Sequence, residues 1–196
     1  NQHKLSGINR LKEGKVAAIF LAAGTGSRLG IKMPKALFPL FPEKSRTLLS
    51  ILCEKAAFTE NVVGKSLPIA IMCSEKNRQE IQQYLEKNGF FGLRNVELFE
   101  QKAIQHPSGE ISSGGNGDLY HFLEKAEILP QWKALGVEEV SLIPIDNPLA
   151  EPFDPFLIGF RFEKSLDAAM IAIKNEEEEN KHMGALVDEG GEIRIL

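Results

Sequence analysis

The chain lacks three features that would mark a special class of protein: many cysteines, a long apolar run and a surplus of basic residues. Its two cysteines, Cys53 and Cys73, each lie inside an apolar run, so we interpret both as small core residues in a protein of a reducing compartment. No stretch reaches the roughly 18 apolar residues of a membrane span, and the first residues lack the apolar segment of a secretory signal. These absences predict a cytoplasmic protein without a membrane partner.

Positive charge is the third scarce feature. Lysine and arginine number 23 against 27 aspartates and glutamates, which leaves a formal net charge of -4. Nucleic-acid-binding proteins gather Lys and Arg on one face, so this balance argues against a nucleic-acid partner. Any anionic ligand must therefore be held by a local group of residues. The hydrophobic share of 43% is enough to bury one sizeable core, and we predict a single domain.

What the chain does contain is an alternation of apolar runs and helical patterns. Runs typical of buried parallel strands cover residues 16–21, 68–73, 96–99, 140–145 and 168–173. Helical patterns cover residues 47–58, with Thr47 as the N-cap, and residues 75–88, 118–129 and 156–164. Strands that alternate with helices predict an α/β fold with a mixed, mainly parallel central sheet.

Both ends of the chain carry a prediction. Residues 1–14 are expected to form an N-terminal helical segment. At the other end, Ile193 and Ile195 alternate with polar residues, as in one strand of a hairpin, and nothing follows. Because a domain rarely finishes in an incomplete hairpin, we expect the chain to be a C-terminally truncated piece of a longer protein.

The most informative segment is LAAGTGSRLGIKMPK, residues 21–35, which follows the first predicted strand. Open α/β sheets bind their ligands at the carboxyl ends of the strands, and this loop lies at such an end. Gly24 and Gly26 can adopt backbone angles closed to other residues and let amide groups approach an anion. Arg28 and Lys35 add positive charge, so the segment predicts a phosphate site. A glycine-rich turn with two surface cations is the alternative.

Two better-known phosphate loops do not match this segment. A Walker P-loop needs GxxxxGK[ST], but Gly30 is followed by Ile31 and Lys32. A dinucleotide fingerprint needs GxGxxG and an acidic residue at the end of the second strand. The spacing here is GxGxxxG, and Glu43 follows Pro42 in a loop. The sequence therefore disfavours both a P-loop and an NAD site.

The segment resembles the signature of the sugar nucleotidyltransferases, LxxGxGTRLxxxxPK. Over residues 12–196 the chain is similar to the UDP-N-acetylglucosamine and UDP-sugar pyrophosphorylase family, through PKALFPL, TLLSILCEKA, KNGFFGL, LFEQ, GGNGDLY and IDNPLAEPFDPFLIGF. The resemblance implies a Rossmann-like, GT-A-like nucleotidyltransferase domain, with residues 1–196 as its nucleotide-binding part. It also implies that the glycine loop holds the nucleotide phosphates, with Arg28 and Lys35 as catalytic cations. The implied phosphate-binding residues are Ala23, Gly24, Thr25, Gly26, Arg28 and Lys35.

The same resemblance assigns residues to the base and the sugar. Gln101 follows a predicted strand and can offer one donor and one acceptor to the edge of a uracil. Without the family it would be interpreted as a surface residue. Within SSGGNGDLY, Gly115 is implied to lie against the base and Asn116 to bond the sugar phosphate, whereas a capped loop is the alternative. Asn147 is also expected to contact the substrate.

Asp146 directly follows the apolar run at residues 140–145, on the sheet edge that also carries the glycine loop. A carboxylate there is a suitable Mg²⁺ ligand, because hard cations take oxygen donors and bridge phosphates. Asp-Asn-Pro on its own is a turn signal. The resemblance implies that Asp146 approaches the metal, so we expect Mg²⁺ as the cofactor.

The implied reaction is attack of a sugar 1-phosphate on the α-phosphorus of UTP, with release of pyrophosphate. The attacking phosphate is already ionised, so positioning and charge neutralisation are expected to carry catalysis. The histidines are expected to be ordinary surface or loop residues: His3, His106, His121 and His182. The expected sugar is N-acetylglucosamine 1-phosphate. Formation of UDP-glucose, cytidylyl transfer and UTP binding without turnover are the alternatives.

Overall fold

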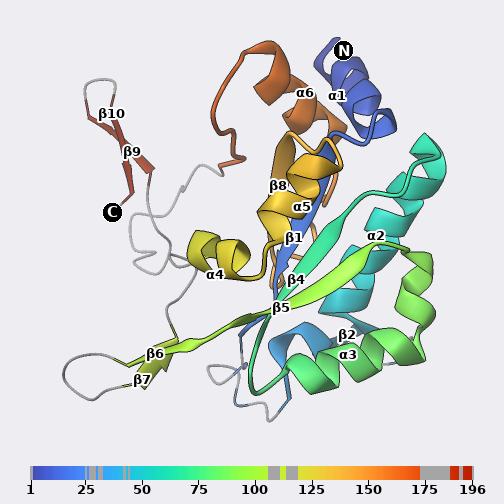
Figure 1. The fold of residues 1–196 in the computed structure, drawn as a ribbon, viewed down its shortest axis with the longest axis vertical. Coiled ribbons are helices and arrows are strands. Elements are labelled where there is room, and N and C mark those ends of the chain that lie inside the picture. The colour runs from blue at the N-terminus through green and yellow to red at the C-terminus, as the bar shows by residue number, and fades with distance from the viewer. Residues whose placement is uncertain are drawn as a thin grey trace.

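The protein is built around a four-stranded parallel sheet in the order β5-β4-β1-β8 (Figure 1). A computed structural model describes residues 2–24, 26, 30, 33–41, 43, 45–105, 111–113, 119–172, 186–189 and 192–195, with the backbone alone for 103–105, 111–113, 186–189 and 192–195. The strands are β1 (Val16–Leu21), β4 (Ile69–Ser74), β5 (Val96–Gln101) and β8 (Glu139–Pro144). All neighbouring pairs are parallel, which confirms the predicted α/β fold and its mainly parallel sheet.

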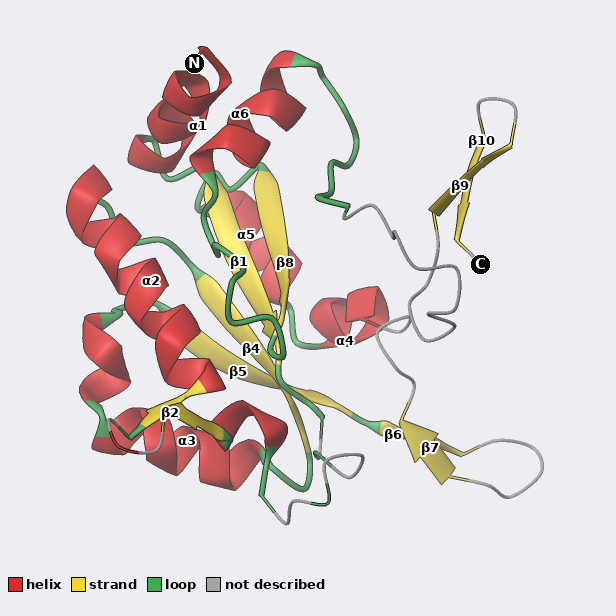
Figure 2. Cartoon of the chain, turned by 180° about the vertical axis from the view of Figure 1, so that it is seen from behind, coloured by secondary structure: helices red, strands yellow, loops and turns green. Residues whose placement is uncertain are grey.

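Helices cover both faces of this sheet. Leu48–Val63 (α2) and Arg78–Lys87 (α3) lie on one face, whereas Leu119–Lys125 (α4) and Ile128–Ala134 (α5) lie on the other (Figures 1 and 2). Alternate residues of β1 point to the two faces, so Phe20 packs with α2 and Ile19 packs with α4 and α5. A central strand buried on both faces explains why residues 16–21 form one continuous apolar run.

The boundaries of α2 follow from its cap residues. Thr47 forms the predicted N-cap: its side chain accepts from the amide of Ser50, and the Ser50 side chain accepts from the amide of Thr47. Gly64 ends the helix with a φ of 69°, in the left-handed region that favours glycine. Short 3-10 helices occupy Lys35–Leu37 (η2) and Gly89–Gly92 (η4).

Two predicted elements are wrong in their extent or type. The helix predicted over residues 118–129 is two helices, α4 and α5, because Glu127 adopts a φ of 56° that breaks the helical path. The strand predicted over 168–173 is absent from 168–172, where Met170 is 63% exposed and Ile171 is 72% exposed. Apolar composition alone does not form a strand, which needs a hydrogen-bonded neighbour, and the described sheet ends at β8.

The remaining strands form short antiparallel pairs. Pro39–Phe41 (β2) pairs with Arg46–Thr47 (β3), and Ala103–Gln105 (β6) pairs with Ile111–Ser113 (β7). The alternating pattern near the end of the chain lies in a hairpin of Leu186–Glu189 (β9) and Glu192–Ile195 (β10). Among the described residues, no helix has the length and apolar character needed to cross a membrane.

At the amino ends of β1 and β8, Gln2–Lys12 (α1) packs on Pro155–Glu163 (α6) (Figure 2). The helix α1 confirms the helical part of the predicted segment at 1–14. The two helices touch at Gly7 and Gly159, where a Cβ atom on Gly7 would lie 1.8 Å from the Pro155 carbonyl oxygen. Nearby, Arg10 places Nε 2.7 Å from Glu139 and Nη2 2.7 Å from Glu138.

This close approach predicts an unusual stability effect for Gly7→Ala and Gly159→Ala. In an ordinary helix, such a change stabilises by about 1 kcal/mol. Here we expect a net loss of about 1–3 kcal/mol, because the added methyl group must displace backbone atoms. Thermal unfolding should show a Tm lowered by roughly 2–4 °C per kcal/mol. Asn9→Ala on the exposed side of α1 should instead leave the Tm unchanged or raise it slightly, because Ala is the better helix former. A raised Tm for either glycine variant would contradict the close contact.

Candidate functional site

The glycine loop begins where β1 ends, at the carboxyl edge of the sheet. Its base is closed by a backbone hydrogen bond from the amide of Lys35 to the carbonyl of Gly24, at 3.2 Å. Gly26 and Gly30 have φ values of 70° and 66°, which side-chain-bearing residues rarely adopt. The backbone therefore favours glycine at these two positions.

A buried asparagine holds the start of this loop against the neighbouring strand. Asn77 is 3% exposed, and its Nδ2 donates to the carbonyl oxygen of Ala22 at 3.0 Å. Its Oδ1 accepts from the amide of Ser74 at 2.8 Å. Sequence patterns assigned no role to Asn77, which lies inside the helix predicted over residues 75–88.

Lys35 and Asp146 meet at the carboxyl edge of the sheet. The Nζ atom of Lys35 lies 2.6 Å from Oδ2 of Asp146, although the residues are far apart in the chain. The side chains are 29% and 52% exposed, so both remain accessible to a ligand. The structure thus brings together two residues that the sequence assigned to phosphate and metal. A cation and a carboxylate that are partly exposed can each take a new partner when a charged ligand arrives.

The loop after β8 forms a tight turn around Asn147. The Asn147 side chain accepts from the amide of Leu149 at 3.1 Å, and its carbonyl accepts from the amide of Ala150 at 3.1 Å. Asn147 therefore shapes the turn that carries Asp146, and its predicted contact with substrate stays a prediction. Lys55 of α2 also binds this loop, and no local pattern in the sequence indicated that contact.

The cysteines do not take part in this site. Cys53 and Cys73 are both free and buried, as predicted for core residues. Burial raises the pKa of the Cys73 thiol to about 12, and burial likewise raises the pKa of Cys53. Burial thus favours the neutral thiol at both positions, as expected of core residues rather than reactive cysteines.

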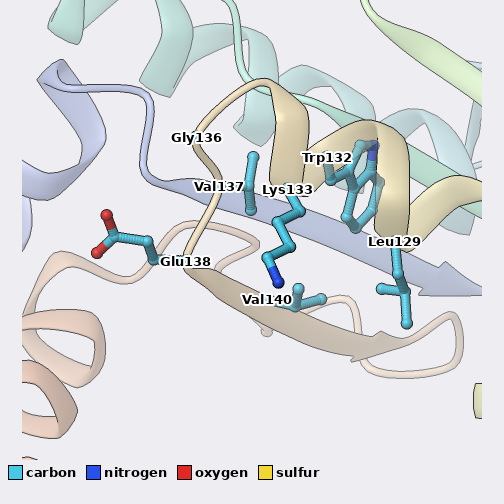
Figure 3. Close-up of a pocket in the computed structure, with 7 residues that line it drawn as sticks. All are labelled: Leu129, Trp132, Lys133, Gly136, Val137, Glu138 and Val140. Atoms are coloured by element: carbon cyan, nitrogen blue, oxygen red, sulfur yellow. The ribbon is translucent and has the colours of Figure 1, made fainter.

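A hollow of about 470 Å³ lies between α5 and β8 (Figure 3). Neither Lys35 nor Asp146 lines it. Its walls include Leu129, Trp132 and Val140, with Glu138 at one end. Residues at the start of β8 line it, whereas the glycine loop is at the carboxyl end of the strands. This hollow is therefore not the phosphate site.

Comparison with known proteins places the chain in a family. A family model described as UTP–glucose-1-phosphate uridylyltransferase matches residues 2–196. The chain belongs to that family. The resemblance seen in the glycine loop and the later motifs is confirmed by this match.

Individual relatives within this uridylyltransferase family are distant in sequence. The UDP-N-acetylhexosamine pyrophosphorylase-like protein 1 of Xenopus tropicalis is 29% identical, with 82% of this chain and 35% of the relative covered. The UDP-N-acetylglucosamine pyrophosphorylase of Saccharomyces cerevisiae is 25% identical, with 90% of this chain and 41% of the relative covered. The chain thus spans well under half the length of these curated relatives.

Solved structures agree on the fold. A uridine diphosphate N-acetylglucosamine pyrophosphorylase from Trypanosoma brucei, solved with an inhibitor, aligns with a TM-score of 0.79 at 26% identity, covering 99% of this chain and 44% of that chain. A structure from Entamoeba histolytica aligns with a TM-score of 0.87 at 24% identity, covering 100% of this chain and 54% of that chain. The expected nucleotidyltransferase fold is therefore confirmed.

Several residues with predicted roles in this family remain predictions. Gln101 is 6% exposed at the last position of β5, in register with Ser74 of β4, so it lies at the carboxyl edge of the sheet. Ala23 is half-buried and directly precedes Gly24. The other assigned positions lie outside the described residues: Thr25, Arg28, Gly115 and Asn116.

Proposed function

We propose that this chain holds the nucleotide in a uridylyltransferase that joins UTP to a sugar 1-phosphate and releases pyrophosphate. The preferred sugar is N-acetylglucosamine 1-phosphate, which agrees with the names of the relatives from yeast and Trypanosoma brucei. The observation that carries the proposal is the pairing of Lys35 with Asp146 beside the glycine loop. Family membership supports the same reaction class.

In this proposal, the glycine loop receives the phosphates of UTP. Backbone amides of the loop approach the phosphate oxygens, and the cations Arg28 and Lys35 neutralise their charge. Ala23, Gly24, Thr25 and Gly26 form the backbone of this cradle. Gln101 and Gly115 receive the uracil, while Asn116 and Asn147 face the sugar phosphate.

The described residues fit a magnesium ion that is shared with the phosphates. Within the ranges the structure describes, no cluster of three or more acidic, His or Cys side chains could form a complete protein site. Mg²⁺ commonly uses one or two carboxylates together with waters and substrate phosphates, so Asp146 alone is a sufficient protein ligand. The half-exposed Asp146 carboxylate already attracts a cation, the Lys35 ammonium. When bound, the ion would neutralise charge on the phosphates.

The chemistry requires no protein nucleophile. An oxygen of the sugar 1-phosphate attacks the α-phosphorus of UTP, a new phosphorus–oxygen bond forms, and the bond to the β-phosphate oxygen breaks. Pyrophosphate leaves with the bonding electrons. The residues of this chain contribute by aligning the two substrates and by balancing the negative charge that they bring together.

The test is a pyrophosphate-release assay on the full-length protein. UTP, CTP, ATP and GTP are each combined with a panel of sugar 1-phosphates. We expect the highest kcat/KM with UTP, because the proposed role of Gln101 is to bond one edge of uracil. Among the sugars we expect N-acetylglucosamine 1-phosphate to be preferred, in line with the names of the relatives. Equal rates with the four nucleotides would reject the uracil assignment. A clear preference for glucose 1-phosphate would favour UDP-glucose formation, the reaction in the description of the matching family.

A further inference from the structure

Lys55 is bound to the loop that carries Asp146. It belongs to α2, and its Nζ donates to the carbonyl oxygens of Pro148 at 3.1 Å and Ala150 at 2.9 Å. The same atom lies 2.8 Å from Oε1 of Glu151. An ammonium group has three N–H donors, so these three acceptors occupy it fully. All three N–H donors of Lys55 therefore bind residues of a single loop.

This loop is fixed at its two ends by apolar packing and in its middle by Lys55. Ile145 before the loop is 3% exposed, and Phe153 after it is 2% exposed. The loop runs from β8 back toward α6 on the face of the sheet that α2 covers (Figure 2). Lys55 thus joins the centre of the loop to the helix beneath it.

Asp146 projects from the start of the same loop. Its carboxylate is 52% exposed and contacts the Lys35 ammonium at 2.6 Å. A side chain that projects from a turn follows the path of that turn, and displacements of about 1 Å can cost about 10²-fold in rate. Holding the turn therefore holds the carboxylate in place.

We propose that Lys55 is a positioning residue for the transfer reaction, which keeps Asp146 directed at Lys35 and at the nucleotide phosphates. This inference rests on the proposed function. Lys55 itself touches neither substrate, because its donors are taken by Pro148, Ala150 and Glu151. Its effect passes through the turn to Asp146.

Lys55→Met tests the proposal, because methionine keeps much of the side-chain length and removes all three donors. In the full-length protein we expect kcat/KM to fall by about 10- to 100-fold, the range for losing a group that orients a metal ligand. The Mg²⁺ concentration for half-maximal activity should rise several-fold. Lys55→Arg should restore part of both values, because it retains charge and donors.

Glu54→Gln is the matched control. Glu54 is the preceding residue of α2 and pairs with Arg46 rather than with the Asp146 loop. Its Mg²⁺ dependence should equal that of the wild type.

Hydrogen exchange supplies a readout besides activity: the amides of Leu149 and Ala150 should lose protection in Lys55→Met and keep it in Glu54→Gln. If Lys55→Met does not fold, Glu151→Gln is the second variant, because it removes the negative charge that pairs with Lys55. It should raise the Mg²⁺ requirement above that of the wild type, by less than is expected for Lys55→Met.

Two failures are distinguishable. If the wild type releases no pyrophosphate with any substrate pair, the proposed function fails, and this inference falls with it before any variant is made. If the wild type is active but Lys55→Met lowers the rate equally at all Mg²⁺ concentrations, Lys55 only supports the fold. An unchanged rate and unchanged exchange would also overturn the positioning role.

Discussion

Replacing Lys35 with alanine in the full-length protein is expected to lower kcat/KM by about 10²-fold or more, the scale for losing one preorganised electrostatic contact. Lys35 is the first residue of η2, and its amide already bonds the Gly24 carbonyl at the base of the glycine loop. That backbone bond remains in the variant, so the loop should keep its shape. The loss then reports the ammonium group alone. Steady-state kinetics, with UTP varied at saturating Mg²⁺, measures this fall in kcat/KM.

A lysine at the same end of the sheet provides the control for this prediction. Lys76 is exposed between β4 and α3, and Lys76→Ala changes the net charge by the same amount. We expect near wild-type kinetics for Lys76→Ala, because general attraction of an anionic substrate is screened by salt over about 10 Å. If Lys35→Ala also turns over at nearly the wild-type rate, Lys35 is only a surface cation and the glycine loop is an ordinary turn.

The elements that sequence patterns predicted well are those with one unambiguous environment. Residues 16–21 form β1 as predicted, because every side chain in this central strand meets a packed neighbour on either face. Thr47 caps α2 as predicted, because capping depends on residues only three positions apart. Local patterns therefore located the four strands of the parallel sheet and its carboxyl edge, where the candidate site lies.

The contacts that support the site depend on residues far apart in the chain. Lys55 binds carbonyl groups more than 90 residues away, and Asn77 bonds Ala22 across 55 residues. In the sequence, Lys55 and Asn77 both lie inside predicted helices, where a polar residue is typical of a solvated position. Backbone carbonyls carry no side-chain identity, so no residue pattern marks them as partners. The same limit explains the wrong strand prediction at residues 168–172: a strand needs a hydrogen-bonded neighbour, and local composition does not show whether one is present.

Replacing Asp146 with asparagine is expected to weaken Mg²⁺-dependent UTP binding and turnover strongly while leaving the fold intact. Asparagine keeps the shape and the hydrogen-bonding size of the side chain, but it removes the formal charge that a divalent cation needs. The lost ion pair with Lys35 is half exposed, and pairs of this kind contribute about 0–1 kcal/mol. The Tm should therefore stay within a few degrees of the wild type.

Titration of Mg²⁺ against wild type and Asp146→Asn separates the metal role from the turn role. Asn serves almost as well as Asp in a turn, so a turn residue would tolerate this change without any shift in Mg²⁺ dependence. The Lys35→Ala variant adds a second discrimination, because it breaks the same ion pair but leaves the carboxylate in place. If the pair acted only as a structural contact, both single variants and the double variant would have the same effect. We expect different effects instead: Asp146→Asn should raise the Mg²⁺ requirement, and Lys35→Ala should lower the rate even at saturating Mg²⁺.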